Sequence, residues 1–179
     1  MLYVDAVRGF TSAAQTSLQA VANPGLATTL DSWNWYGLDP PGPGARYIGV
    51  IKIRDALARN APNGPNQIAM ARSSILAAYA AWEHETRPAL AAELGIDTNQ
   101  VTSPTFGDLN KYRQAVAHVS GRLDRATEVL DLVAVGANVD LGDATLAALF
   151  DALVSEAKRL SEALCGLHLD HQFIKRMTH

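Results

Sequence analysis

Residues 67–95 read QIAMARSSILAAYAAWEHETRPALAAELG, and this stretch decides the fold more than any other. Its apolar row repeats every seven residues, at Ile68, Ile75, Trp82 and Ala89. Such a row predicts one long amphipathic helix, and the alanines beside it allow another helix to pack closely. Pro88 lies inside the pattern and predicts an interruption near Arg87, because proline removes a backbone hydrogen bond. Gly95 predicts the end of the helix.

The residues before this helix are less regular. Apolar side chains at helical spacing predict a helix over residues 4–22, which Asn23-Pro24-Gly25 ends. Several prolines and glycines argue against regular structure in residues 28–45. The aromatic side chains there are Trp33, Trp35 and Tyr36. We expect them to anchor this loop to the body, and the alternative is stacking on a base or a sugar. The loop from Trp33 to Gly44 can serve as a lid or simply pack.

Residues 48–59 fit two structures. Ile48, Val50 and Ile51 are β-branched and suit a strand, whereas residues 54–59 are typical of a helix. We predict one helix over residues 48–59. Ala61-Pro-Asn-Gly-Pro65 then breaks the chain.

Helices are also expected after residue 104. Thr105 and Asp108 resemble a capping box, and the helix that they open ends near Gly121. Residues 122–135 are predicted as helix, although their second half is apolar enough to be extended. After a turn at residues 136–138, Asp143 is expected to cap a last helix that ends at Gly166. The apolar face of this last helix comprises Leu146, Leu149, Phe150, Leu153, Ala157, Leu160 and Leu164.

The composition is that of a globular protein. The chain has 179 residues, of which 48% are hydrophobic and 18% charged, and its formal net charge is -3. The charge excludes an overall basic nucleic-acid-binding protein, although a local basic site is compatible with it. A single cysteine, Cys165, excludes a disulfide framework within one chain and a cysteine-rich zinc site. No signal peptide or membrane helix is predicted, so we expect a cytoplasmic protein.

Five or six helices and no expected strand predict an all-α helical bundle. We expect a single domain over residues 1–179. Within it, residues 1–65 contribute N-terminal helices and the loop rich in proline and glycine, and residues 66–166 form the core. Residues 167–179 form a polar tail.

The segment KYRQAVAHVSG, residues 111–121, holds the candidate catalytic residues Arg113 and His118. Arginine is a permanent cation, and histidine is the side chain that exchanges protons near neutral pH. Five residues separate them, which places their side chains about 140° apart around a helix. They converge only if the helix ends early at His118, or if a second copy of the chain brings its own pair alongside.

This segment resembles the signature of the HEPN superfamily, in which an arginine and a polar residue precede a histidine. Here the three are Arg113, Gln114 and His118. The helix around residues 73–83, where Glu83 follows an aromatic residue, is also similar to a long core helix of that family. The resemblance covers about residues 67–164. It implies a helical bundle that forms homodimers, and in many members a metal-independent ribonuclease. Such enzymes often act as the toxin of a toxin–antitoxin or phage-defence pair, so RNA and an antitoxin are the expected partners.

The residue types suit RNA cleavage without a cofactor or metal. RNA carries its own nucleophile, the 2′-hydroxyl group, and His118 can accept its proton or protonate the leaving oxygen. Arg113 can bind the phosphate through two hydrogen bonds and stabilise the transition state. Gln114 can orient either group. The products are a 2′,3′-cyclic phosphate and a 5′-hydroxyl.

Neighbouring charges are candidates for supporting roles. Glu83 either hydrogen-bonds Arg113 or is a solvated charge. Lys111, Arg122 and Arg125 either guide an RNA backbone or form a solvated face. Successive residues of a helix point in different directions, so residues 83–85 make a poor metal site. Two readings compete with the ribonuclease: a non-catalytic HEPN-like bundle that binds a nucleotide or protein partner, and an unrelated structural bundle.

Overall fold

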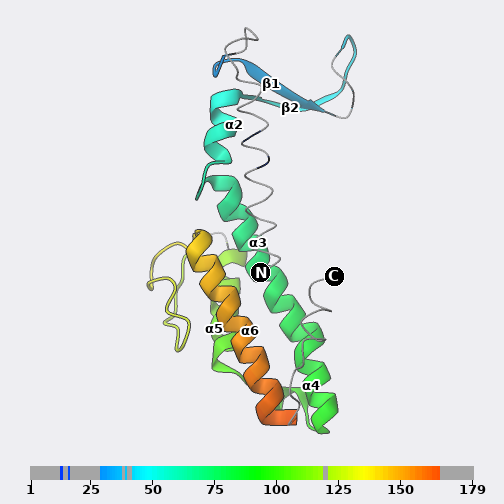
Figure 1. The fold of residues 1–179 in the computed structure, drawn as a ribbon, viewed down its shortest axis with the longest axis vertical. Coiled ribbons are helices and arrows are strands. Elements are labelled where there is room, and N and C mark those ends of the chain that lie inside the picture. Colours follow the sequence, from blue (N-terminus) through cyan, green and yellow to red (C-terminus); the bar gives the residue numbers. More distant parts are fainter. Residues whose placement is uncertain are drawn as a thin grey trace.

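The computed structural model describes residues 29–37, 39, 42–118 and 121–165, together with Ala13 and Thr16. Its described part is mostly helical, with one two-stranded sheet. Figure 1 shows an elongated molecule in which α3 and α4 run along much of its length, with α5 and α6 beside them and the sheet at one end. The helix expected over residues 4–22 and the tail at 167–179 lie outside the described residues, apart from helical Ala13 and Thr16.

The sheet corrects two expectations from the sequence. Strand β1, Trp33–Gly37, pairs antiparallel with β2, Tyr47–Lys52, and Trp33 lies opposite Lys52. Regular structure was not expected in the first segment, and the second was expected to be helical. The prolines and glycines of residues 40–44 lie between the strands, and the pairing is irregular only at Gly37, the end of β1. The β-branched residues of β2 follow their strand preference.

Trp33 does not anchor this region to the body. Its side chain is 56% exposed, and Lys52 Nζ lies 5.5 Å from the centre of its ring. Helix α2, Ile53–Arg59, follows β2 directly and buries Ile53 and Ala56. The predicted helix is therefore correct for residues 53–59 and wrong for residues 48–52.

The long central helix is interrupted by a π-helical segment. Helix α3, Pro65–Ala81, continues through a π-helix at Trp82–Thr86 into α4, Arg87–Leu94, and Gly95 ends it with φ 64°. The interruption lies where Pro88 predicts it, since proline leaves a carbonyl one turn earlier without its usual donor. It also shifts the buried face, so that Ala91 is buried and Ala89 is exposed.

Helix α5, Pro104–Ala117, begins differently from the prediction. Ser103 is the N-cap, and its hydroxyl accepts a hydrogen bond from Phe106 N at 3.3 Å. Thr105 and Asp108 both lie inside the helix and are buried, so the proposed capping box is wrong. The chemical reason is that Asp108 binds backbone amides of the loop after α5 instead.

That loop corrects another expectation, because residues 122–135 are not helical. Its described geometry includes a bridge between Arg122 and Asn138 and a turn at Gly136, where φ is 84°. The Tyr112 hydroxyl donates to Leu130 O at 2.5 Å, which fixes the loop against α5.

Helix α6, Asp143–Cys165, closes the core against α4 and α5. The expected apolar face is confirmed where its side chains are described. Its buried members are Leu146, Leu149, Leu153 and Leu160. Asp143 opens the helix, and its carboxylate accepts a hydrogen bond from the Gln67 side chain. Among the helices of the described ranges, none combines the length and the hydrophobicity needed to cross a membrane.

Candidate functional site

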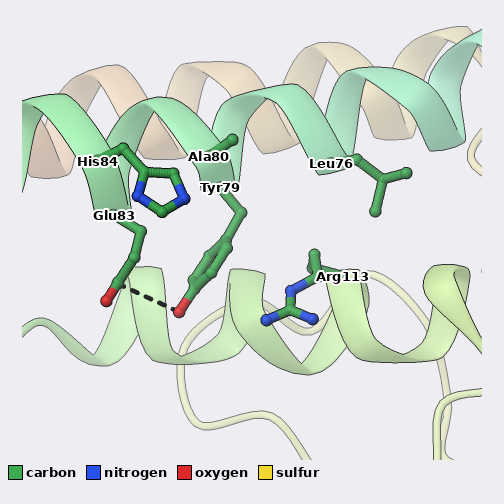
Figure 2. A pocket seen from close by; sticks show the side chains of 6 residues that line it. All are labelled: Leu76, Tyr79, Ala80, Glu83, His84 and Arg113. Atoms are coloured by element: carbon green, nitrogen blue, oxygen red, sulfur yellow. Dashed lines mark hydrogen bonds between the residues drawn. The ribbon is translucent and has the colours of Figure 1, made fainter.

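An open hollow of about 350 Å³ lies between the central helix and α5. Its lining residues are Leu76, Tyr79, Ala80, Glu83, His84 and Arg113 (Figure 2). Five of the six come from α3 and the π-helical segment, and Arg113 comes from α5. The packing of α5 against α3 therefore brings together residues that are some thirty positions apart in the sequence.

Helical spacing explains most of this lining. Residues three and four apart share one face of a helix, which places Tyr79 and Glu83 together. Neighbours such as Glu83 and His84 diverge by about 100° in a regular α-helix. In the π-helical segment, however, both line the hollow, whereas Glu85 does not. Two adjacent residues can line one open hollow from different sides, as Tyr79 and Ala80 also do, so this lining does not contradict the expectation for residues 83–85.

Arg113 provides the cation of the hollow. Its guanidinium carbon lies 5.1 Å from the centre of the Tyr79 ring, within the range of a cation–π interaction. In the described part of the chain, Arg113 forms no ion pair with a carboxylate. Arg113 also interacts with the Tyr79 hydroxyl, but no carboxylate of the described residues competes for it with an anion that enters the hollow.

Glu83 takes neither role that the sequence suggested. Its carboxylate accepts hydrogen bonds from Arg87 Nη1 at 3.1 Å and from the Tyr79 hydroxyl at 3.3 Å. It is thus a paired group beside the hollow and not the hydrogen-bonding partner of Arg113. Burial raises the pKa of Tyr79, and the Glu83 charge raises it further against the opposing effect of Arg113. Tyr79 therefore remains a neutral hydrogen-bond donor.

His118 lies at the C-terminal end of α5, outside the hollow. It is the C-cap residue, with φ -88° and ψ 151°, and its side chain is exposed. The helix does end before His118, yet this does not bring His118 beside Arg113 in the hollow of one chain. Gln114 is half-buried on the same helix, and its backbone carbonyl accepts a hydrogen bond from the backbone N–H of His118.

The three flanking cations have different surroundings. Lys111 binds Asp108 at 2.9 Å and lies 3.5 Å from Glu128, and these carboxylates raise its pKa. Arg122 donates to Gly136 O at 2.7 Å. Arg125 is exposed, without an ion pair among the described residues. Arg122 is also exposed and, like Arg125, forms no ion pair with a described carboxylate, so of the three only Lys111 is neutralised by acidic partners.

A second hollow, of about 210 Å³, adjoins the first and shares Tyr79 and Glu83 with it. Its other lining residues are Trp82, Arg87, Val101, Thr102, Ser103, Phe106, Gly107 and Asn110. Trp82 and Phe106 stack with ring centroids 3.8 Å apart and form its apolar wall.

Sequence reasoning identified Arg113 and Glu83 but missed Tyr79, His84 and Asn110. The i,i+4 spacing of Tyr79 and Glu83 was a usable signal, because it predicts a shared helix face. His84 follows Leu76 and Ala80 at the same spacing of four, which is a signal of the same kind. Within the described ranges, no three His, Cys, Asp or Glu side chains are grouped as metal ligands.

Comparison of the chain with protein-family models, with curated proteins and with solved structures finds no match. The site is therefore interpreted from its own geometry and chemistry.

Proposed function

We propose that this protein is a metal-independent endoribonuclease of the HEPN type that acts as a homodimer. The observation that carries the proposal is Arg113, a cation in an open hollow with no carboxylate partner in the described part of the chain. An arginine in this state suits a phosphodiester, which its planar guanidinium can bind through two hydrogen bonds. The resemblance of the segment around Arg113 to the HEPN signature gives the reaction class.

In the proposed reaction the 2′-hydroxyl of RNA attacks the adjacent phosphorus, and the 5′-oxygen leaves. The bond from phosphorus to the 2′-oxygen forms as the bond to the 5′-oxygen breaks, which yields a 2′,3′-cyclic phosphate and a 5′-hydroxyl. His118 transfers the proton between these oxygens, and Arg113 stabilises the charge on the phosphate oxygens. Gln114 orients the phosphate, and Arg125 binds the backbone beyond it.

The dimer supplies what one chain lacks. Because His118 is exposed at the helix end and does not line the hollow of its own chain, a second copy is needed in this proposal to bring His118 to each Arg113. A two-fold axis near the end of α5 places both Arg113 and both His118 side chains in one cleft. By the same resemblance, the biological role is that of a toxin paired with an antitoxin or of a phage-defence nuclease.

Cleavage of end-labelled RNA in EDTA tests the reaction. We expect wild type to cleave and to leave a cyclic phosphate, and Arg113→Ala and His118→Ala to be slower by about a hundredfold or more. Arg59→Ala is the matched control, because Arg59 is an exposed arginine of α2 far from α5 in the sequence. Undiminished cleavage by His118→Ala would overturn the proposal.

His84→Ala separates two assignments of the histidine. Because His84 shares the hollow with Arg113, a reaction completed within one chain would depend on it. We expect this variant to retain cleavage within about tenfold of wild type, since the proposed proton transfer uses His118. Loss of cleavage in His84→Ala with retention in His118→Ala would assign the reaction to the single-chain hollow.

A second candidate function is a non-catalytic bundle that binds a nucleotide. It is favoured by the second hollow, whose polar and aromatic lining continues that of the first. Nucleotide binding without cleavage of any RNA would support this candidate.

A further inference from the structure

The two hollows adjoin at two shared lining residues, and we name the pair the 79–83 groove after these residues. Tyr79 and Glu83 line both parts. Arg113 lies in one part and Asn110 in the other, and these two residues are three apart on α5. Residues at this spacing lie on the same face of a helix with their Cβ atoms about 5–6 Å apart. A single small ligand can therefore contact both side chains.

Asn110 is distinguished by an unsatisfied polar atom. Its Oδ1 is the one buried side-chain oxygen or nitrogen in the described part of the chain that has no hydrogen-bond partner. A buried acceptor without a donor destabilises a fold, because the desolvation of the acceptor is not offset by a hydrogen bond. Leucine is of similar size and would avoid this cost. The asparagine is therefore better explained by a ligand donor than by packing.

Most of the other polar side chains of the second hollow either already form hydrogen bonds within the protein or can only accept them. The Ser103 hydroxyl donates to Glu156 at 2.6 Å, and the guanidinium of Arg87 binds Glu83 and Val101 O. Glu83, which is an acceptor, lines the groove beside Asn110. Two acceptors against the apolar wall of Trp82 and Phe106 suit a flat ligand that presents N–H donors on its edge.

We propose that the 79–83 groove binds one nucleotide of RNA, with its phosphate at Arg113 and its base beside Asn110, and that Asn110 selects a base with an exocyclic amino group. The inference rests on the proposed function, which supplies the phosphate at Arg113. Because Oδ1 is buried, the Asn110 amide must rotate about its terminal bond to present the oxygen to the base. Adenine and cytosine carry an amino donor at the corresponding position, where uracil carries a carbonyl oxygen.

Calorimetric titration with 3′-CMP and 3′-UMP tests the base preference. The two nucleotides differ in that cytosine has an amino group where uracil has a carbonyl oxygen, with the matching change in protonation of the adjacent ring nitrogen. We expect wild type to bind 3′-CMP about threefold to tenfold more tightly, as one hydrogen bond allows. We expect Asn110→Leu to bind the two equally, with an unchanged or higher melting temperature. Asn99→Ala is the matched control, because Asn99 is an exposed asparagine outside the groove.

Equal affinity of wild type for the two nucleotides, or a preference that persists in Asn110→Leu, would overturn the inference. Absence of binding of either nucleotide at millimolar concentration would also overturn it. The proposed function is tested separately from the base preference. If cleavage depends on Arg113 but the two nucleotides bind equally, the base preference is refuted and the nuclease is not. A preference for 3′-CMP that depends on Asn110, in a protein that cleaves no RNA, upholds the nucleotide groove and removes the nuclease.

Discussion

A single buried carboxylate, that of Asp108, holds the loop after α5 against the helix. Asp108 is fully buried, and its Oδ2 accepts hydrogen bonds from three successive backbone amides. The donors are Glu128 N at 2.8 Å, Val129 N at 2.7 Å and Leu130 N at 2.9 Å. Lys111 Nζ lies 2.9 Å from the other oxygen. One side chain therefore satisfies a turn that has no regular backbone pairing of its own.

The ionisation of Asp108 follows from these contacts. Burial raises the pKa of the carboxyl, but the three backbone amides and the Lys111 ammonium outweigh it and hold the pKa below its usual value. Because the folded-state pKa is lower than the value of about 3.9 for an unfolded aspartate, ionised Asp108 stabilises the fold above that pH. This contribution is lost as the pH falls from there through the folded-state pKa.

Replacement of Asp108 tests this role. We expect Asp108→Ala to lower the free energy of unfolding at neutral pH by about 3 kcal/mol, because three buried amides lose their acceptor. The exposed control Asp131→Ala should change it by no more than about 0.5 kcal/mol. Urea denaturation at neutral pH and at about pH 3 measures both. The deficit of Asp108→Ala should shrink in acid, and an equal deficit at both pH values would contradict the pKa direction.

The sequence predicts candidate site residues only where their relative positions follow from spacing along a single helix. Arg113 stood out as a cation near a histidine, and Glu83 followed an aromatic residue. The cation–π contact of Arg113 with Tyr79 depends on how α5 packs on α3, which no local pattern records. The buried oxygen of Asn110 likewise becomes visible only in the packed structure.

Glycine has different roles at the end of α4 and in the interior of α5. Gly95 ends α4 in the left-handed conformation, with φ 64°, and a Cβ there would meet no atom within 4 Å. Gly107 lies inside α5, where a Cβ would also meet nothing within 4 Å. The two sites therefore differ in backbone conformation and not in space.

Alanine at these two glycines should change stability in opposite directions. We expect Gly95→Ala to lower the free energy of unfolding by about 1 kcal/mol, because side chains disfavour the left-handed region. We expect Gly107→Ala to raise it by about 0.5–1 kcal/mol, because alanine favours the helix. Thermal unfolding of both variants measures the difference. Destabilisation by Gly107→Ala would show that this position is not an ordinary helical one.

The long helices could be predicted because their apolar periodicity extends over many turns. The central helix, its end at Gly95 and the face of α6 all follow from such patterns. The short elements could not, because their structure depends on distant partners. Strand β1 exists through pairing with β2, and residues 122–135 take an irregular path because Asp108 and Tyr112 bind their backbone. In β2 the strand propensity of the β-branched residues prevailed over the predicted helix, because a partner strand is present there.

Arg113 and His118 lie at different places on α5. Arg113 lies in the hollow between α3 and α5 (Figure 2), while His118 is exposed at the end of the helix. The proposed nuclease therefore requires a second copy, and its site is shared between chains. This requirement separates it from an enzyme that completes its site with His84 in one chain.

Co-expression of Arg113→Ala and His118→Ala chains with different affinity tags measures whether the site is shared. Sequential purification gives a heterodimer with one intact Arg113 and one intact His118, on different chains. We predict that this heterodimer cleaves RNA in EDTA far faster than either variant homodimer, because the two intact residues meet in one cleft. A heterodimer no faster than the variant homodimers, or a wild-type protein that cleaves RNA as a monomer, would contradict the shared site.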